Sequence, residues 1–364
     1  MMHTRDWKGS TALAGTASSK IIKANSRYVR DNFVTFDQAT MDSAGAFLIG
    51  ELERLDPMIH LPLAAVTWQR DIDLRTDVQM GDEVSSFTQS SFGSSGGAVG
   101  NSINWASKDT TTIARTTVDI GKVAAPLNLV TYEVAYTIPE LKSSELTGRP
   151  IDSQMIAGMT LKHQMDVDQI VYIGDANVTL SNGNTLSGLV NSPYVTNLLT
   201  AAATGTGSAT TFISKTPQQI LTDFNTLLIS AWAATGYSII PDNILIAPVP
   251  FGYLATTPMV IGSTGVSESI LSYIKKNNIL TAEKDVEINF QSVKWLAAAN
   301  RPGASTDRMV AYVKKQDFVR FPMVPLQAVQ PQFRGIWVAV PYYGRLGQVE
   351  VVYPETIAYM DGIN

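Results

Sequence analysis

Oxygen-bearing side chains at alternate positions are the first feature of this sequence that could do chemistry. Asp175, Asn177 and Thr179 have this spacing in the stretch GDANVTLSNGNTLSGLVN. A calcium loop of the EF-hand type needs such spacing together with a glycine at its sixth position and a glutamate at its twelfth. The stretch holds Leu180 and Leu186 at those two positions. We therefore predict no metal site here and interpret the stretch as a helix exit followed by a turn and a loop.

Histidine is the side chain best suited to acid–base catalysis near neutral pH, and the chain has only 3 of them. His3 lies in a polar N-terminal segment, and His60 lies between two apolar residues. His163 falls on or beside the apolar stripe of a predicted helix, with Asp166 three positions further on. No second histidine or acidic ligand has a suitable spacing, and neither a GxSxG nor an HExxH motif occurs. The sequence therefore predicts no catalytic residue and no metal ligand.

Two further patterns resemble functional motifs without meeting their requirements. The stretch GSSGGAVG is rich in glycine, but a phosphate-binding loop ends in Gly-Lys-Ser/Thr, and here Gly100 is followed by Asn101. We interpret it as the tip of a hairpin and expect no nucleotide or other cofactor. Asp71 and Asp73 form a carboxylate pair that alternates with apolar residues. We interpret that pair as part of a solvated face.

The composition favours a protein whose surface is buried against other subunits. Charged residues make up only 16% of the 364 residues, against the roughly one quarter that is usual, while hydrophobic residues make up 45%. A chain this poor in charge has much apolar or neutral surface. The net charge of -5 argues against a protein that grips the phosphates of nucleic acid, although it allows one that encloses DNA.

Several classes of site and location are excluded by what the sequence lacks. It contains no cysteine, so no disulfide, thiol chemistry or thiolate metal site is possible. It has no run of about 18 apolar residues, as a membrane span requires, and no apolar signal core near the N-terminus. We therefore expect no contact with membranes and a protein that is cytosolic when made.

In the first third of the chain, the sequence predicts an extended arm, a short helix and a long hairpin. Residues 1–40 are polar with scattered charges, and a short amphipathic helix is predicted after them. Residues 64–74 and 111–121 alternate apolar and polar side chains, and a Gly- and Ser-rich tip separates them. Such a projecting hairpin cannot bury its own apolar residues, so we expect it to lie on another molecule.

Two strong helices are predicted in the rest of the chain. One covers residues 151–173, with Pro150 at its start and Gly174 as its stop. The other begins at Thr216, which forms a capping box with Gln219. A short branched strand, a second helix and three strands follow that helix, and the chain returns as a strand near its end. This order predicts a separate mixed α/β domain.

The order of these parts resembles that of the major capsid proteins of tailed phages, whose fold is the α+β Hong Kong 97 (HK97-like) type. The motifs YTIPEL, GD…GLVNSP and PDNILIAPVPFGYL are similar to those of the encapsulin-like branch of this superfamily. The resemblance covers roughly Ala39 to Ile363. Each motif is weak alone, and their order is much more specific.

The resemblance implies a division of the chain into named domains. The hairpin would be the E-loop, the long helix would be the spine helix of the P-domain, and the mixed α/β region would be the A-domain. The implied boundaries are 1–40 for the N-terminal arm, 41–68 for the first helix and lead-in, 69–121 for the E-loop, 122–215 for the P-domain with its spine helix at 151–173, 216–335 for the A-domain, and 336–364 for the strand that returns to the P-domain.

The resemblance also implies a function without enzymatic activity. The chain would assemble in the host cytoplasm into the hexamers and pentamers of an icosahedral virion capsid around double-stranded DNA, without sequence-specific binding. Expected partners are many copies of itself and a portal, and scaffold or decoration proteins remain open. The E-loop would lie across a neighbouring subunit. The residues expected at that subunit interface are Phe87, Phe92, Trp105, Lys108 and Arg115.

Two departures from the family and two alternatives stay open. About forty residues precede the first helix, too few for the scaffolding segment that many relatives carry. Lys108 is the only lysine of the hairpin before Gly121, so we expect noncovalent contacts instead of an isopeptide cross-link. An encapsulin, which is a bacterial nanocompartment shell of the same fold, fits the composition equally well. A hydrolase is disfavoured, because no convergent titratable residues are found.

Overall fold

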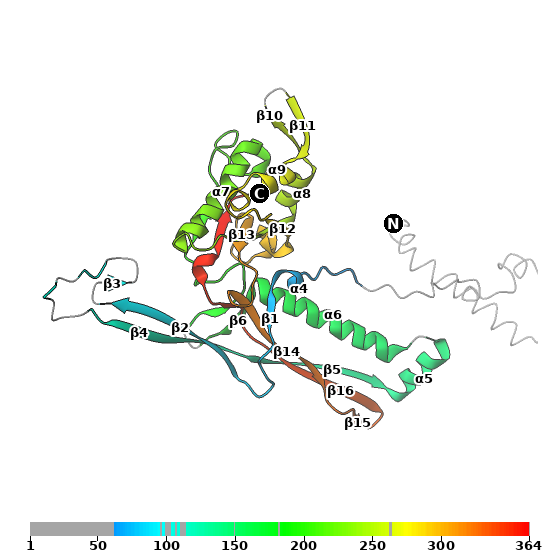
Figure 1. Cartoon of the computed structure of the whole chain (residues 1–364). Helices are drawn as coiled ribbons and strands as arrows, with labels where there is room; N and C mark the ends of the chain where they lie inside the picture. The colour runs from blue at the N-terminus through cyan, green and yellow to red at the C-terminus, as the bar shows by residue number, and fades with distance from the viewer. Residues whose placement is uncertain are drawn as a thin grey trace, which may run out of the picture. The chain divides into compact units, whose positions relative to one another are not determined.

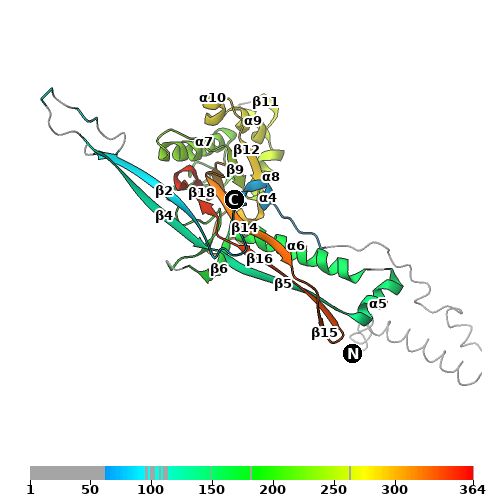
Figure 2. The same ribbon diagram turned by 60° about the horizontal axis from the view of Figure 1, so that its bottom comes forward.

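The computed structural model describes residues 62–94, 97–98, 103–105, 108–109, 114–148, 150–180, 183–261 and 264–363. The chain divides into two compact units, Met1–Leu63 and Ala64–Asn364, and all helices and strands within the described residues belong to the second unit. The predicted arm and the short helix after it lie outside the described residues. Figures 1 and 2 show the second unit from two directions.

The predicted hairpin is present, but its outgoing arm is not the segment expected. Strand β2 (Val84–Ser94) pairs with β4 (Thr116–Pro126) over eleven residue pairs without a register shift, and β3 (Gly97–Ala98) adds to β2. Both views show the two long strands extending beyond the other sheets of the unit (Figures 1 and 2). Strand β4 runs directly into the next strand, β5 (Asn128–Thr137).

The prediction that residues 64–74 form the outgoing arm was wrong. Trp68–Asp71 form the short helix α4, and β1 (Asp73–Arg75) pairs with a strand from the last quarter of the chain instead of with the returning arm. The alternation of side chains indicated a strand, but Trp68 and Asp71 are both buried in the body of the unit. Alternation alone does not distinguish a strand from one helical turn that buries two of its four side chains.

A six-stranded sheet lies beside helix α6 (Ile151–Tyr172). Strand β5 pairs with β16 along its whole length, from Asn128 opposite Leu346 to Thr137 opposite Trp337. Alternate residues of β5 face helix α6, and Tyr132 donates a hydrogen bond to Asp166 of that helix. The elements of this layer are β1, β5 (Asn128–Thr137), β14 (Val319–Ala328), β15 (Gln332–Arg334), β16 (Trp337–Leu346), β17 (Glu350–Val351), α5 (Ile138–Thr147) and α6 (Ile151–Tyr172).

The stop of helix α6 and the stretch after it match the prediction closely. Helix α6 ends before Gly174, which has a φ of 77°. A Cβ atom at this position would lie 2.0 Å from the carbonyl oxygen of Leu186, so only glycine fits. Strands β6 (Gly174–Thr179) and β7 (Thr185–Ser187) then form a small hairpin, as the turn-and-loop interpretation predicted.

A second, five-stranded sheet carries the helices of the later domain. Successive side chains along its strands point alternately into two hydrophobic cores. Ile244 and Met309 belong to the core shared with the helices of this domain, whereas Leu245 and Val310 belong to the core shared with Val171 of α6. The strands, in spatial order, are β12 (Asn289–Ser292), β9 (Asn243–Ile246), β13 (Arg308–Tyr312), β18 (Ala358–Asp361) and β8 (Leu198–Thr200).

The predicted helix from Thr216 is α7, and its capping box is present. The hydroxyl of Thr216 accepts a hydrogen bond from the amide of Gln219, whose side chain in turn accepts one from the amide of Thr216. Three further helices and one hairpin complete the domain, with four short 3-10 turns in the described part of the unit. They are α7 (Pro217–Ala234), α8 (Pro248–Thr256), α9 (Ile270–Lys276), α10 (Ile279–Lys284), β10 (Pro258–Ile261), β11 (Thr264–Ser269), η1 (Phe212–Ser214), η2 (Lys294–Leu296), η3 (Ala298–Asn300) and η4 (Pro354–Thr356).

The chain changes sheets at other points than the sequence suggested. After Tyr312 it leaves the five-stranded sheet, so β14 and β15 lie in the sheet beside the spine helix and not with the helices of the later domain. The final strand, β18, joins the five-stranded sheet. Short apolar strands look alike in sequence, and their sheet follows from pairing partners that are distant along the chain.

Candidate functional site

One face of the hairpin carries apolar side chains that are exposed to solvent. Paired residues of two strands share a face, and Phe92 lies opposite Val118. Ile120 follows Val118 on the same face, and the exposed fractions of the three side chains are 55%, 55% and 67% in the order Phe92, Val118, Ile120. We call these three residues the hairpin patch. Nothing within the described residues covers it.

The five residues predicted at a subunit interface do not all lie together. Phe92 belongs to the hairpin patch, while Phe87 is half-buried on the opposite face near the base of the hairpin. Trp105 is 87% exposed, and Lys108 and Arg115 are exposed as well. Exposure is compatible with a contact to another copy, and the interface role of these residues stays a prediction.

A second exposed apolar group lies at the far end of the six-stranded sheet, and the sequence reasoning missed it. Strands β15 and β16 turn around Gly335, and Phe333, Ile336 and Trp337 flank the turn with exposed fractions of 74%, 59% and 48%. The amide of Ile138 donates to the carbonyl of Ile336, which places the start of α5 beside this group. The signal in the sequence was FRGIW, a glycine turn between large apolar residues.

Buried ion pairs hold the root of the hairpin to the body of the unit. Glu350 is 4% exposed and lies 3.0 Å from Arg75 and 2.6 Å from Arg320. The hydroxyl of Ser85, at the start of β2, donates to the same carboxylate. We call Arg75, Arg320 and Glu350 the root cluster. Arg345 adds to it by donating to the carbonyl groups of Met80 and Leu127, on either side of the hairpin base.

Helix α6 binds the segment that leads into the hairpin through a fully buried carboxylate. Asp168 accepts hydrogen bonds from the amides of Thr67 and Trp68, at 2.8 and 3.1 Å, at the start of α4. It also accepts one from the indole of Trp295 at 2.7 Å and lies 3.2 Å from the ammonium group of Lys294. These contacts satisfy the carboxylate, so its burial is structural.

The interpretation of Asp71 as a solvated residue was wrong. Its side chain is 1% exposed, pairs with the guanidinium of Arg70 at 2.7 Å and accepts a hydrogen bond from the hydroxyl of Tyr172. Burial and the neighbouring Asp71 raise the pKa of Tyr172, so its hydroxyl remains a donor. The buried partners explain the error, because no sequence spacing links residues about 100 positions apart.

His163 is buried in the packing between α6 and β5. Its ring lies edge-on to Tyr132 with 5.7 Å between centroids, and its Nδ1 atom has no hydrogen-bond partner among the described residues. Burial lowers its pKa, and the nearby Asp166 opposes this only in part. The contacts described for His163 are the edge-on packing with Tyr132 and the charge of Asp166.

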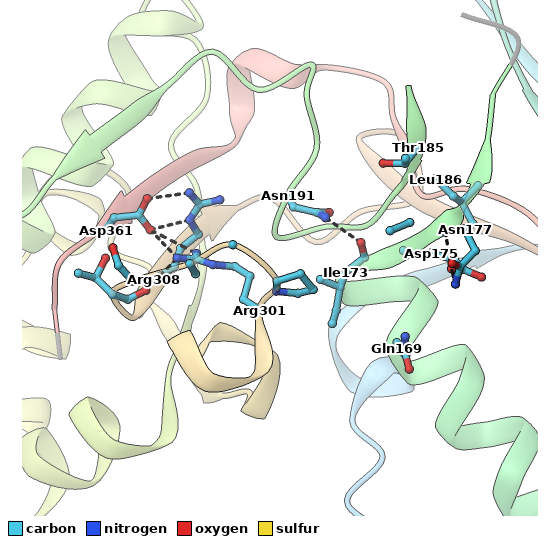
Figure 3. A pocket seen from close by; sticks show the side chains of 17 residues that line it. Gln169, Ile173, Asp175, Asn177, Thr185, Leu186, Asn191, Arg301, Arg308 and Asp361 are labelled. Atoms are coloured by element: carbon cyan, nitrogen blue, oxygen red, sulfur yellow. Dashed lines mark hydrogen bonds and ion pairs between the residues drawn. The ribbon is translucent and has the colours of Figure 1, made fainter. Parts of the chain in front are cut away.

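A cavity lined by Arg301, Arg308 and Asp361 offers no reactive arrangement (Figure 3). It has a volume of about 580 Å³, and Arg301 and Arg308 both point at Asp361 there. The guanidinium of Arg308 lies 2.7 Å from that carboxylate and that of Arg301 lies 3.2 Å from it. Burial acts to raise the pKa of Asp361, but its contacts with Arg308 and Arg301 lower it overall. The two guanidinium groups and the carboxylate of this cavity therefore pair with one another.

A metal site needs several clustered ligands and a membrane span needs a long apolar helix, and neither occurs among the described residues. Within those residues, no three histidine, aspartate or glutamate side chains lie close enough to hold a metal ion. In the same part of the chain, no helix combines the length and the apolar character needed to cross a membrane.

Comparisons with known proteins point in one direction. A family model described as "Major capsid protein" matches residues 102–363. No curated protein sequence matches the chain. The solved capsid of Myoviridae phage XM1 is similar, with a TM-score of 0.68 and 17% identity, over 88% of this chain and 100% of that one. The capsid of the native GTA particle has a TM-score of 0.54 and 10% identity, over 91% of this chain and 100% of that one. Microbacterium phage Oxtober96 has a TM-score of 0.53 and 11% identity, over 91% and 99%. These likenesses confirm the expected α+β, HK97-like fold.

Proposed function

The chain belongs to the major capsid protein family, whose model matches residues 102–363, and from this premise we propose how it builds a shell. It is a tailed-phage capsid protein of the HK97-like type and a component of the virion capsid. Its role is structural and not enzymatic, because its family and its fold are those of capsid proteins. Self-association into a shell follows from that membership.

We propose that copies of the chain form the hexamers and pentamers of an icosahedral shell in the host cytoplasm, with the hairpin lying across a neighbouring copy. The hairpin patch carries this proposal, because Phe92, Val118 and Ile120 are exposed on an arm that extends beyond its own sheets. Burial of each such side chain contributes about 1.5–3 kcal/mol. Many such contacts in a closed shell act together, so weak individual contacts suffice.

The root cluster supports the same arrangement. An arm that must reach a neighbour gains affinity when its direction is fixed before binding, since less conformational entropy is lost. The buried contacts of Glu350 with Arg75 and Arg320 fix the base of the hairpin in this way. The exposed group formed by Phe333, Ile336 and Trp337 offers a second surface for contacts between copies.

We propose that the shell encloses double-stranded DNA without gripping it. The net charge of -5 and the low charged fraction of 16% do not favour extensive contact with phosphates. A portal would be needed to fill such a shell. The encapsulin alternative predicts protein cargo instead of DNA inside the purified particles.

Electron microscopy of the purified chain tests the proposed function. We expect closed shells from the wild-type chain and only unassembled subunits from Phe92→Ser combined with Ile120→Ser. The substitution Val286→Ser, at a side chain that is 47% exposed on the loop after α10, is the matched control and should still assemble. A wild-type chain that stays monomeric at every concentration and salt condition would contradict the proposal.

A further inference from the structure

Strand β5 has a free main-chain edge. The amide of Ile138 donates to the carbonyl of Ile336, and Pro341, which has no N–H, lies opposite Glu133. Both facts give the same alternation, in which even-numbered residues of β5 bond to β16 and odd-numbered residues point away from it. No described residue pairs with the outward main-chain groups, which belong to Leu129, Thr131, Glu133 and Ala135.

Apart from the charge of Glu133, this edge lacks the features that normally protect an edge strand. Strand β5 is ten residues long, contains neither proline nor lysine, and pairs with β16 without a bulge. Its sequence, NLVTYEVAYT, is rich in residues that favour strands. Leu129 is 58% exposed on it. A long, regular and exposed edge of this kind is a template for pairing with another strand.

The returning strand of the hairpin, β4, has a free edge as well. The amide of Leu127 donates to the carbonyl of Glu83 at 2.9 Å, which assigns the odd-numbered residues of β4 to the bonds with β2. The even-numbered residues therefore direct their N–H and C=O groups outward. Within the described residues these groups have no strand partner, and they belong to Val118, Ile120, Lys122 and Ala124.

The two free edges are complementary to one another. Each presents four residues over roughly 20 Å of extended chain. The outward residues of β4 include one charge, that of Lys122, and those of β5 include one opposite charge, that of Glu133; both side chains are exposed. An antiparallel register with Lys122 opposite Glu133 also brings Ile120 opposite Ala135.

We propose that β4 of one copy pairs edge-to-edge with β5 of a second copy, in the antiparallel register that sets Lys122 opposite Glu133. This inference rests on the proposed function, because the partner is another copy in the shell. Two residues of the hairpin patch, Val118 and Ile120, lie on this edge, so the same contact reduces their exposure. Each copy offers one β4 edge and one β5 edge, and such a head-to-tail contact forms a ring where its rotation closes.

Site-directed cross-linking tests the register, since the chain contains no cysteine of its own. In assembled Lys122→Cys/Glu133→Cys chains, a short bismaleimide should produce a ladder of covalent multimers on a denaturing gel. Asp119→Cys/Glu133→Cys is the matched control, because Asp119 lies on the opposite face of β4 and its main-chain groups point toward β2. Assembled shells that yield no ladder, or an equal ladder from the control, overturn the inference.

A proline substitution tests the main-chain pairing independently. Thr131→Pro removes one outward N–H and leaves the bonds between β5 and β16 intact. Thr131→Val keeps the N–H and the preference for a strand. We expect Thr131→Val to assemble and Thr131→Pro to remain as folded subunits, as measured by sedimentation and by an unchanged circular dichroism spectrum.

The outcomes separate this inference from the proposed function. If Thr131→Pro forms shells like those of the wild type, edge pairing is wrong while the capsid role stands. If the wild-type chain itself forms no shell, both the capsid role and the pairing are wrong. Should Thr131→Pro fail to fold, the cross-linking ladder alone decides, and its absence from wild-type-like shells overturns the pairing.

Discussion

The carboxylate of Glu350 lies 3.0 Å from the guanidinium of Arg75, although the two residues are 275 positions apart in the chain. This contact joins the lead-in to the hairpin with the last quarter of the chain. Both groups are largely removed from solvent, so the pair supplies part of the counter-charge that each group needs. The direction of the hairpin is therefore set by a contact between two distant parts of the chain.

Removal of the charge of Glu350 should destabilise the subunit. Glu350→Gln keeps the size of the side chain but leaves Arg75 and Arg320 without their shared anion. We expect the free energy of unfolding to fall by about 3 kcal/mol, as for other broken buried pairs. Urea denaturation of the unassembled subunit measures it. Asp77→Asn is the control, because Asp77 also contacts Arg75 but is 66% exposed. An equal loss in both variants would contradict the assignment.

The buried carboxylate of Asp168 should be as sensitive to substitution. Asp168→Asn leaves the buried amides of Thr67 and Trp68 competing for one neutral acceptor and removes the charge beside Lys294. We expect a loss of about 2–3 kcal/mol, together with a shifted fluorescence of Trp295. Asp166→Asn on the same helix, whose side chain is 29% exposed, should cost less. Fluorescence that stays unchanged would show that the contact with Trp295 is not formed in solution.

Two glycines with similar backbone angles separate backbone strain from steric overlap. Gly174 has a φ of 77° and Gly183 a φ of 80°, but only at Gly174 would a Cβ atom overlap with the backbone, 2.0 Å from Leu186. Gly183→Ala should cost about 1–2 kcal/mol from backbone strain alone. We expect Gly174→Ala to cost several times more in thermal unfolding. Equal midpoints for the two variants would contradict this account.

The stability of the subunit should depend on pH through His163. Burial lowers the pKa of this histidine below its ordinary value of 6.5, so the unfolded chain binds the proton more readily than the folded one. The contribution of the neutral His163 side chain to the free energy of unfolding is therefore complete above pH 6.5. It declines as the pH falls toward the lowered pKa, by about 1.4 kcal/mol for each pH unit by which the pKa is lowered. His163→Phe should flatten this slope between pH 7 and 5 in urea titrations. A slope that the substitution leaves unchanged would assign the effect to other groups.

The features that local chemistry determines were predictable from the sequence. The long helix was predicted at 151–173 and lies at Ile151–Tyr172, because Pro150 and Gly174 mark its ends. The capping box of Thr216 and Gln219 was predicted and is present. Both depend only on residues within a few positions of each other.

The features that depend on distant partners were not predictable. The alternation in residues 64–74 indicated a strand, whereas contacts with Asp168 and Tyr172 of α6 stabilise a helical turn there. The two free edges were missed for the same reason. A sequence shows which side chains alternate, but the direction of a main-chain N–H is known only once one pairing, such as Leu127 with Glu83, is known.

The direct passage of β4 into β5 gives the subunit a mechanical property. Leu127, between the two strands, bonds to Glu83 through its amide and to Arg345 through its carbonyl group. A force that a neighbour exerts on the hairpin is therefore carried along one covalent backbone into the sheet beside the spine helix, with no flexible linker to absorb it. In a shell built from such subunits, a load on one hairpin would pass into the body of the same subunit along this backbone and through the buried contacts of the root cluster.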